Sequence, residues 1–391
     1  MIKRANGKDI AGLRFTSLRL ENWRNFSSVE VELQSRVFLV GPNASGKSNL
    51  LDVFRFLGEL TSVGGGLQAA VRRKPRLSLG SLRSLAARRR SDIVIHVRVG
   101  SDDAPATWEY ELCLGETDKM PCVVREVVRH AGGVLLDRPT PDDLEDPEQL
   151  FQTHLEQVGN NAKFRTLAAF FESVRYMHLV PQLVREPDRS AGLTGDPFGG
   201  DFIEQVARTS IKEQRARLAR VTAALQVAVP QLQELELWTD KAGTPHLRGR
   251  YEHWRAQGAW QNEDQLSDGT LRLLGLLWVM LDSHGPLLLE EPELSLHPEV
   301  VRYLPQVFAR MQQRTGRQIL LSTHSADLLR DEGIGLDEVL LLIPRKEGTE
   351  VRSARAIPEV ATLLAHGSTL DETLLPLTRP RDASQLRLFA D

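Results

Sequence analysis

The feature that most constrains the fold is GPNASGKS at residues 41–48, which we call the phosphate loop. It fits the pattern G-x-x-x-x-G-K-S/T without deviation. It follows the mostly apolar run 36–40 and precedes a helical pattern over 49–60. Strand, glycine-rich loop and helix is the context that phosphate binding needs, and it argues against a chance glycine-rich turn. The sequence therefore predicts an α/β fold in which backbone N–H groups and a helix N-terminus surround a polyphosphate.

Two side chains of this loop have specific expected roles. Lys47 would reach the β- and γ-phosphates, and the Ser48 hydroxyl would bind Mg²⁺. Glycine at 41 and 46 allows the tight turn and the close approach of the backbone. The expected cofactors are ATP and Mg²⁺.

A second motif is LLLEEPE at residues 287–293. Three apolar residues followed by two acids predict a buried strand with carboxylates at its C-terminal end, where open α/β sheets bind ligands. We expect Glu290 to hold Mg²⁺ through its water shell and Glu291 to orient and deprotonate the attacking water. Glu290 stands where aspartate is more usual.

Two shorter motifs follow the same order along the chain. In LSDGTLR, residues 266–272, Ser267 and Gly269 can present a hydroxyl and N–H groups to an anion. In isolation a plain helix cap is the simpler interpretation, but the place of the motif one helix ahead of the Glu290-Glu291 strand favours the anion contact. In LSTHS, residues 321–325, His324 closely follows a strand. A lone histidine is usually structural, but this position favours contact with the γ-phosphate.

Charge is distributed unevenly along the chain. The net charge is −3, yet residues 71–90, which we call the basic segment, contain eight basic residues and no acidic ones. Such polarisation can mark a contact with a polyanion such as DNA. A solvated basic loop, or pairing with acids elsewhere, is an equally good interpretation. The candidate nucleic-acid contacts are Arg72, Arg73, Lys74, Arg76, Arg83, Arg88, Arg89 and Arg90.

Patterning predicts the remaining elements and the domains. Strands are expected at 15–21, 29–33, 93–97, 107–114, 123–129, 133–137, 174–180, 232–239, 246–251, 286–289, 318–321 and 339–343. Helices are expected at 149–173, 202–229, 271–281 and 299–314, and surface loops at 139–148 and 191–200. The predicted domains are an ATPase core at 1–60 and 262–391 with an antiparallel β lobe at 93–137, a stretch with the basic segment at 61–92, and a mainly helical lobe at 138–261.

Composition excludes several classes of protein. No window approaches 18 consecutive apolar residues, so no membrane partner or span is expected. The two cysteines, Cys113 and Cys122, lack metal-type spacing, and the first residues lack the apolar region of a secretory signal. We therefore expect a cytoplasmic protein without disulfides.

The ordered motifs resemble the ABC-type ATPase head shared by SMC, RecF and OLD-like proteins. The resemblance covers roughly residues 13–60 and 262–345. LENWRNF at 20–26 is similar to the xNFRxF start of RecF and SMC heads, and EEPELSLHP at 290–298 resembles the EEPExxLHP form of OLD-like and related AAA ATPases. It implies a P-loop ABC-type head with a mainly parallel core sheet, an antiparallel β lobe and an inserted helical lobe.

The resemblance also implies an assembly. Two heads of a homodimer would close around two ATP molecules, with Ser267 and Gly269 of one subunit touching the γ-phosphate held by the other. Arg24 would lie near the phosphates, Gln182 would be the Q-loop residue that senses Mg²⁺, and His324 would be the switch histidine. The predicted catalytic residues are Glu291, Lys47 and His324, and the predicted metal residues are Ser48, Glu290 and Gln182. The predicted ATP-binding residues are Arg24, Asn43, Ala44, Ser45, Gly46, Lys47, Ser48, Asn49, Ser267 and Gly269.

Two departures from the relatives shape the predicted function. Only 67 residues follow His324, without the acidic cluster of a Toprim nuclease, so any nuclease or toxin would be a separate partner. The 217 residues between Ser48 and Leu266 leave room for compact lobes but not for a long coiled coil, and they disfavour a transporter subunit. The leading hypothesis is an ATP-hydrolysing dimer acting on DNA in repair or anti-phage defence. The alternative is an ATP-dependent scaffold that controls a partner nuclease or toxin without binding DNA.

Overall fold

The computed structural model describes residues 10–73, 75–87, 92–187, 195–254, 259–282, 285–379 and 385. The chain divides into two compact units, which we treat separately. Unit 1 comprises residues 1–175, 284–288 and 306–391, and unit 2 comprises residues 176–283 and 289–305. These boundaries differ from the predicted domains, because 138–175 belongs to unit 1 and most of 262–305 belongs to unit 2.

Unit 1 contains an antiparallel sheet of six strands in the order β2-β1-β4-β5-β6-β7. The strands are β1 (Arg14–Trp23), β2 (Phe26–Glu32), β4 (Ile93–Gly100), β5 (Trp108–Thr117), β6 (Met120–His130) and β7 (Gly133–Arg138). Alternate residues of β4 and β5 are buried, as expected for a sheet with one covered face. The predicted antiparallel lobe thus exists, and β1 and β2 extend it.

A second sheet has the strand order β15-β14-β3-β13-β12-β8. Its strands are β3 (Arg36–Val40), β8 (Arg175–Met177), β12 (Leu287–Glu290), β13 (Ile319–Thr323), β14 (Val339–Arg345) and β15 (Gly348–Ser353). In unit 1, β3 pairs in parallel with both β13 and β14, and β15 pairs antiparallel to β14. β3 and β13 are almost entirely buried, as parallel strands covered on both faces should be.

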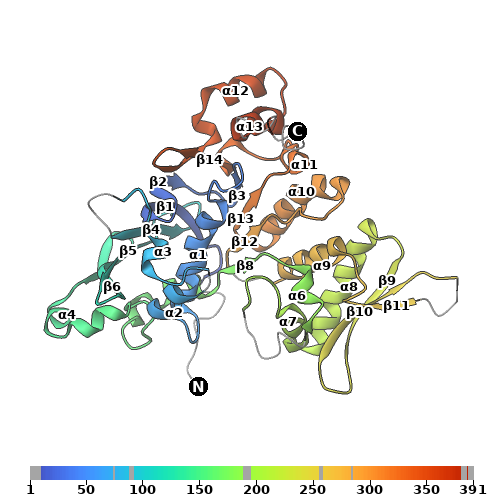
Figure 1. The fold of residues 1–391 in the computed structure, drawn as a ribbon, viewed down its shortest axis with the longest axis horizontal. Coiled ribbons are helices and arrows are strands. Elements are labelled where there is room, and N and C mark those ends of the chain that lie inside the picture. Colours follow the sequence, from blue (N-terminus) through green and yellow to red (C-terminus); the bar gives the residue numbers. More distant parts are fainter. Residues whose placement is uncertain are drawn as a thin grey trace. The chain divides into compact units, whose positions relative to one another are not determined.

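Helix α1 (Lys47–Thr61) begins at the end of the phosphate loop and packs against α5 (Arg165–Glu172). In Figure 1, α1 lies among the blue and cyan elements of unit 1. Phe15, Phe54, Phe170 and Phe171 form an aromatic cluster between sheet and helices, with ring centroids 4.7–5.9 Å apart. The other short helices of unit 1 are α2 (Leu67–Arg72), α3 (Leu79–Leu82), α4 (Pro141–Glu145), η1 (Pro147–Phe151), η2 (Ala162–Phe164), α11 (Ala326–Leu329), η4 (Leu336–Glu338), η5 (Ala354–Ala356), α12 (Pro358–Ala365) and α13 (Leu370–Thr378).

Unit 2 combines helices with a small antiparallel sheet in the order β11-β10-β9. Its elements are α6 (Pro181–Val184), α7 (Phe202–Arg208), α8 (Ile211–Ala228), β9 (Leu232–Thr239), β10 (Pro245–Tyr251), β11 (Ala259–Asn262) and α9 (Asp268–Met280). Helix α8 packs against β9 and α9, around a core that includes Leu225, Leu235, Leu247 and Leu274. Helix α10 (Pro298–Thr315) begins in unit 2 and ends in unit 1.

Three predictions of secondary structure were wrong. The helix expected over 149–173 is α-helical only in its last third, where α5 is amphipathic, because residues 152–161 form turns held by side chains such as Thr153 and Asn161. The surface loop expected at 139–148 contains α4, since Thr140 and Asp143 form a capping box. Strand β11 was missed, because its four residues show little alternation.

No helix in the described part of the chain is both long and apolar enough to cross a membrane.

Candidate nucleotide-binding site

The phosphate loop joins the end of β3 to the start of α1. Two of its residues have left-handed backbone conformations, Ala44 with φ of 62° and Gly46 with φ of 96°. The side chain of Lys47 is almost fully buried, and its Nζ donates to the carbonyl oxygens of Gly41 at 3.0 Å and Pro42 at 3.2 Å. The predicted strand, loop and helix are therefore present at these residues.

The same lysine contacts the histidine of a distant motif. β13 pairs in parallel with β3, with Thr323 opposite Val40, so both strands end at the same edge of the sheet. There Lys47 Nζ lies 2.6 Å from His324 Nε2. A lysine ammonium can only donate, so Nε2 is the acceptor in this contact. Two motifs 277 residues apart thus meet at one point.

Close packing around the phosphate loop explains the glycine at its first position. A Cβ at Gly41 would lie 2.6 Å from Ser45 Oγ and 2.7 Å from Leu342 O, so only glycine fits. Ser45 is fully buried, and its hydroxyl has no hydrogen-bond partner among the described residues. No group of three His, Cys, Asp or Glu in the described parts could hold a metal ion. Mg²⁺ bound with substrate phosphates needs only one or two protein oxygens, and Ser48 of the loop carries a hydroxyl oxygen of that kind.

The turn between β1 and β2 lies against the loop. Asn25 Nδ2 donates to Ser45 O at 2.8 Å, and Asn25 Oδ1 accepts from Asn49 Nδ2 at 2.7 Å. The neighbouring Arg24, predicted to lie near the phosphates, instead directs its guanidinium to Asp52 in α1, at 3.1 Å. Asn49 is therefore engaged with the turn.

The structure corrects the interpretation of Arg76 in the basic segment. Arg76 is fully buried and forms ion pairs with Asp52 at 2.7 Å and with Glu59, so it is unavailable to a nucleic acid. Arg73 pairs with Glu59 at 3.3 Å and Arg83 with Glu116 at 3.2 Å, whereas Arg72 is exposed. The other four candidates, Lys74, Arg88, Arg89 and Arg90, lie outside the described residues. Pairing with acids, one of the two interpretations above, therefore holds for Arg73, Arg76 and Arg83.

The predicted base Glu291 and the predicted metal residue Glu290 belong to unit 2, at the end of β12. The hydroxyl of Tyr176, also in unit 2, donates a hydrogen bond to Glu290 Oε2. Glu291 has a left-handed backbone with φ of 43°, which costs about 1–3 kcal/mol for a residue other than glycine. The strand thus delivers its carboxylates where the motif predicts.

The LSDGTLR motif starts helix α9 in unit 2. Ser267 is the N-cap, and its Oγ accepts from Thr270 N at 3.1 Å. Gly269 lies against the loop after β12, where an added Cβ would be 2.5 Å from Ser295 O. Gln182, predicted as a Mg²⁺ sensor, directs its amide toward Asp268 of this motif at 3.5 Å.

Sequence analysis missed two residues that contact predicted site residues. Asn25 lies in the RecF-like segment, but that resemblance drew attention only to Arg24. Tyr176 lies in a short strand with no pattern of its own, so only its contact with Glu290 identifies it.

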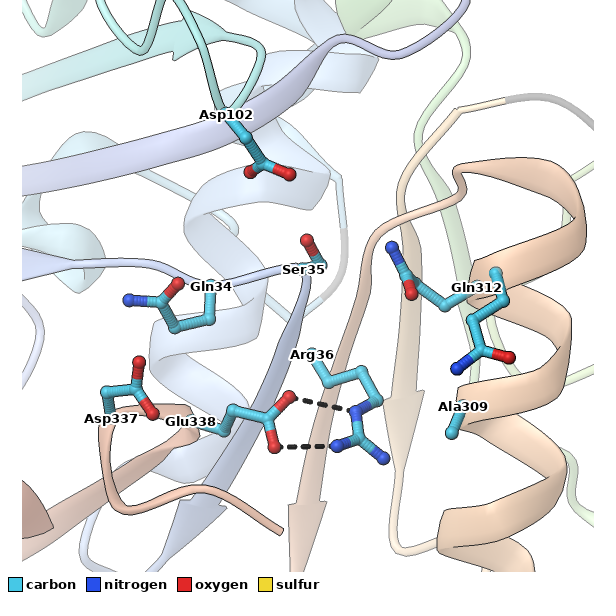
Figure 2. Close-up of a pocket in the computed structure, with 9 residues that line it drawn as sticks. Gln34, Ser35, Arg36, Asp102, Ala309, Gln312, Asp337 and Glu338 are labelled. Carbon is cyan, nitrogen blue, oxygen red and sulfur yellow. Dashed lines mark hydrogen bonds and ion pairs between the residues drawn. The ribbon is translucent and has the colours of Figure 1, made fainter. Parts of the chain in front are cut away.

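A polar cavity of about 390 Å³ in unit 1 lies away from this site. Figure 2 shows Arg36, at the start of β3, paired in two places with Glu338 on one side of the cavity. The cavity is also lined by Gln34, Ser35, Asp102, Ala309, Gln312, Gln313 and Asp337. It lies where β3 and β14 begin, whereas the phosphate loop follows the end of β3. The cavity is therefore separate from the nucleotide site.

Comparisons with known proteins identify relatives. The family model described as "AAA domain, putative AbiEii toxin, Type IV TA system" matches residues 36–331. An SMC head solved bound to the C-terminal winged-helix domain of ScpA is 12% identical with a TM-score of 0.53, over 86% of this chain and 96% of that chain. The SMC head of Thermotoga maritima is 12% identical with a TM-score of 0.44, over 87% of this chain and 98% of that chain. No curated protein sequence matches the chain significantly. The first structural match confirms the predicted α/β fold of a P-loop ATPase head.

Proposed function

Because the chain belongs to the family of AAA domains described as putative AbiEii toxins of type IV toxin–antitoxin systems, we propose that it hydrolyses ATP with Mg²⁺ at sites completed by a second copy. The chain is a P-loop NTPase with the fold of an SMC head. The hydrolysis, the dimer and the partner are the proposal.

The contact between Lys47 and His324 is the observation that carries this proposal. It joins the phosphate loop to the histidine motif at 2.6 Å, within unit 1. An imidazole nitrogen in contact with a buried ammonium is suited to exchange one hydrogen-bond partner for another when an anion is present. Hence Lys47 would turn from the Pro42 carbonyl to phosphate oxygens, and His324 would then contact the γ-phosphate.

The other predicted site residues would have separate roles in metal binding and hydrolysis. Ser48 and Glu290 would hold Mg²⁺, which neutralises charge on the β- and γ-phosphates when it is bound. The hydrogen bond from Tyr176 would orient the Glu290 carboxylate. Glu291 would accept the proton of the attacking water. Ser267 and Gly269 of a second copy would contact the γ-phosphate across an isologous interface.

The direct test is the turnover of ATP by the wild type and by Glu291→Gln. General-base catalysis contributes about 10²–10⁴-fold, so the variant should lose at least about 100-fold in kcat while its affinity for MgATP is kept. Lys47→Ala should lose affinity as well. Hydrolysis by Glu291→Gln at the wild-type rate would rule out the proposed base.

The cellular role we propose is control of a partner nuclease or toxin. The family description, which names a toxin of a toxin–antitoxin system, supports it. A role on DNA is the second candidate, favoured by exposed Arg72, although buried Arg76 weakens it. Glu291→Gln separates hydrolysis-driven from assembly-driven control, because only assembly-driven control persists in that variant. ATPase rates with linear, nicked and single-stranded DNA test the second candidate, and DNA that neither stimulates turnover nor binds would exclude it.

A further inference from the structure

The side chain of Asn25 uses all of its polar atoms to join three elements of unit 1. Its Nδ2 donates to Ser45 O in the phosphate loop and to Thr349 Oγ1 in β15, both at 2.8 Å. Its Oδ1 accepts from Asn49 Nδ2 in α1 at 2.7 Å. An amide group offers two donors and one acceptor oxygen, so each group of Asn25 has a partner.

The hydrogen bond to Ser45 O has a consequence for the phosphate loop. In a trans peptide the C=O and the following N–H point in opposite directions. Holding the Ser45 carbonyl on the Asn25 side therefore directs the Gly46 N–H to the opposite side. The Gly46 N–H belongs to the set that a phosphate loop presents to the phosphates.

Close packing explains why this contact and Gly46 occur together. A Cβ added to Gly46 would lie 2.2 Å from Asn25 Nδ2 and 2.4 Å from Oδ1. The φ of 96° at Gly46 also favours glycine. Only glycine at position 46 leaves room for the amide of Asn25.

Asn25 is itself anchored from the far side. Thr349, which is 5% exposed, donates its N–H to Asn25 O at 2.7 Å in addition to its hydroxyl contact. In the same turn the Trp23 indole donates to Asn49 O at 2.9 Å. The hairpin edge, the turn and the start of α1 thus hold Asn25 in place from several directions.

We propose that Asn25 is a positioning residue of the phosphate loop: through Ser45 O it fixes the peptide that presents the Gly46 N–H to the nucleotide phosphates. The proposal rests on the proposed nucleotide-binding function. It extends that function to a residue outside the phosphate loop.

The test uses the full-length protein and the affinities of MgADP and MgATP, the latter in the Glu291→Gln background. Asn25→Asp is isosteric, keeps the acceptor for Asn49 and removes both donors. Asn25→Ala removes the same donors without adding charge. The affinity of both variants for MgADP should fall by about tenfold or more, the size of one lost hydrogen bond to an oriented group. Their melting temperatures without nucleotide should fall by only a few degrees, because the lost hydrogen bonds are worth about 1 kcal/mol each.

Asn22→Asp is the matched control, because Asn22 lies near the end of β1, just before this turn, but donates from Nδ2 to Asp92 O at 2.9 Å. It makes the same change of charge and shape three residues away and should leave the affinity within about twofold. Thr349→Val removes one anchor of Asn25 and should weaken MgADP binding by a smaller factor, which carries the test if Asn25→Ala does not fold. The inference is overturned if Asn25→Ala binds MgADP with wild-type affinity, or, should Asn25→Ala not fold, if Thr349→Val does. Failure of the wild type to bind nucleotide would instead overturn the proposed function.

Discussion

At the scale of single residues, Asp52 in α1 shows how the basic segment is attached to the ATPase core. Arg76 contacts both oxygens of Asp52, at 2.7 and 2.9 Å, and Arg24 contacts one of them at 3.1 Å. Burial raises the pKa of Asp52, but the charge and hydrogen bonds of Arg76, with Arg24 and Arg55, outweigh burial and lower the pKa below its ordinary value. This stabilisation is therefore present above the ordinary pKa of an aspartate and is lost as the pH falls through the lowered value.

We predict that Arg76→Met destabilises the protein strongly. Removing the guanidinium takes one partner from each of the buried acids Asp52 and Glu59, which costs about 3–5 kcal/mol for a buried pair. Arg24 remains on Asp52, and Arg55 and Arg73 remain on Glu59. Arg72→Met is the control, because Arg72 is exposed and surface changes stay within about 0.5 kcal/mol. Urea unfolding measures the free energy of unfolding of both variants. Equal losses of this free energy in Arg76→Met and Arg72→Met would contradict a structural role for Arg76.

A second residue-scale prediction concerns Gly269 in the LSDGTLR motif. The Cβ of Gly269→Ala would lie 2.5 Å from the Ser295 carbonyl oxygen, so the backbone must shift at a cost of about 1–3 kcal/mol. Gly80→Ala makes the same change at a helical position where the nearest atom is 3.7 Å away. It should leave the free energy of unfolding unchanged within about 0.5 kcal/mol. A Gly269→Ala variant as stable as Gly80→Ala would show that this approach is not close in solution.

At the scale of elements, sequence patterns predicted the helices and strands whose formation depends mainly on local interactions. β9 was predicted with its observed bounds, and β3, the phosphate loop and α1 were predicted in order, because apolar runs and glycines specify them. The irregular stretch 152–161 was not predictable, since its shape depends on contacts such as that of Glu126 with the His154 and Leu155 N–H groups. Asn25 and Tyr176 escaped for the same reason: each is defined by a partner distant in sequence.

The three-stranded sheet of unit 2 should respond to pH through His246. Its Nδ1 lies 2.6 Å from Glu263 Oε1, and its ring stacks on Trp238. Burial lowers the pKa of His246, but the hydrogen bond and charge of Glu263, with Asp240, outweigh burial and raise it above its ordinary value. A raised pKa stabilises the folded state fully below pH of about 6.5 and loses that contribution as the pH rises through the higher folded value.

We predict that the free energies of unfolding of the wild type and of His246→Gln, measured in urea, differ most near pH 6 and least near about pH 9. Because other histidines cancel in this comparison, a difference that stays constant or grows with pH would contradict the assigned pair.

At the scale of the whole molecule, the motif order rather than any single motif identified the ATPase head. The phosphate loop and His324 belong to unit 1, and Glu290, Glu291, Ser267 and Gly269 belong to unit 2. Because isologous dimers bring the same surfaces of two copies together twice, one copy can complete the site of the other. Sequence motifs identified these residues, whereas the proposed contribution of a second copy lies outside a single chain.

Mixing two inactive variants tests the composite site most directly. Lys47→Ala disables the phosphate loop and Ser267→Arg disables the surface offered to the partner, so each protein alone should be inactive. In a heterodimer, the intact loop of one chain meets the intact Ser267 of the other. An equal mixture should therefore recover about a quarter of the wild-type ATPase rate, since half of the dimers are mixed and each has one intact site. A mixture no more active than its components, beside an active wild type, would contradict the central claim that a second copy completes the site.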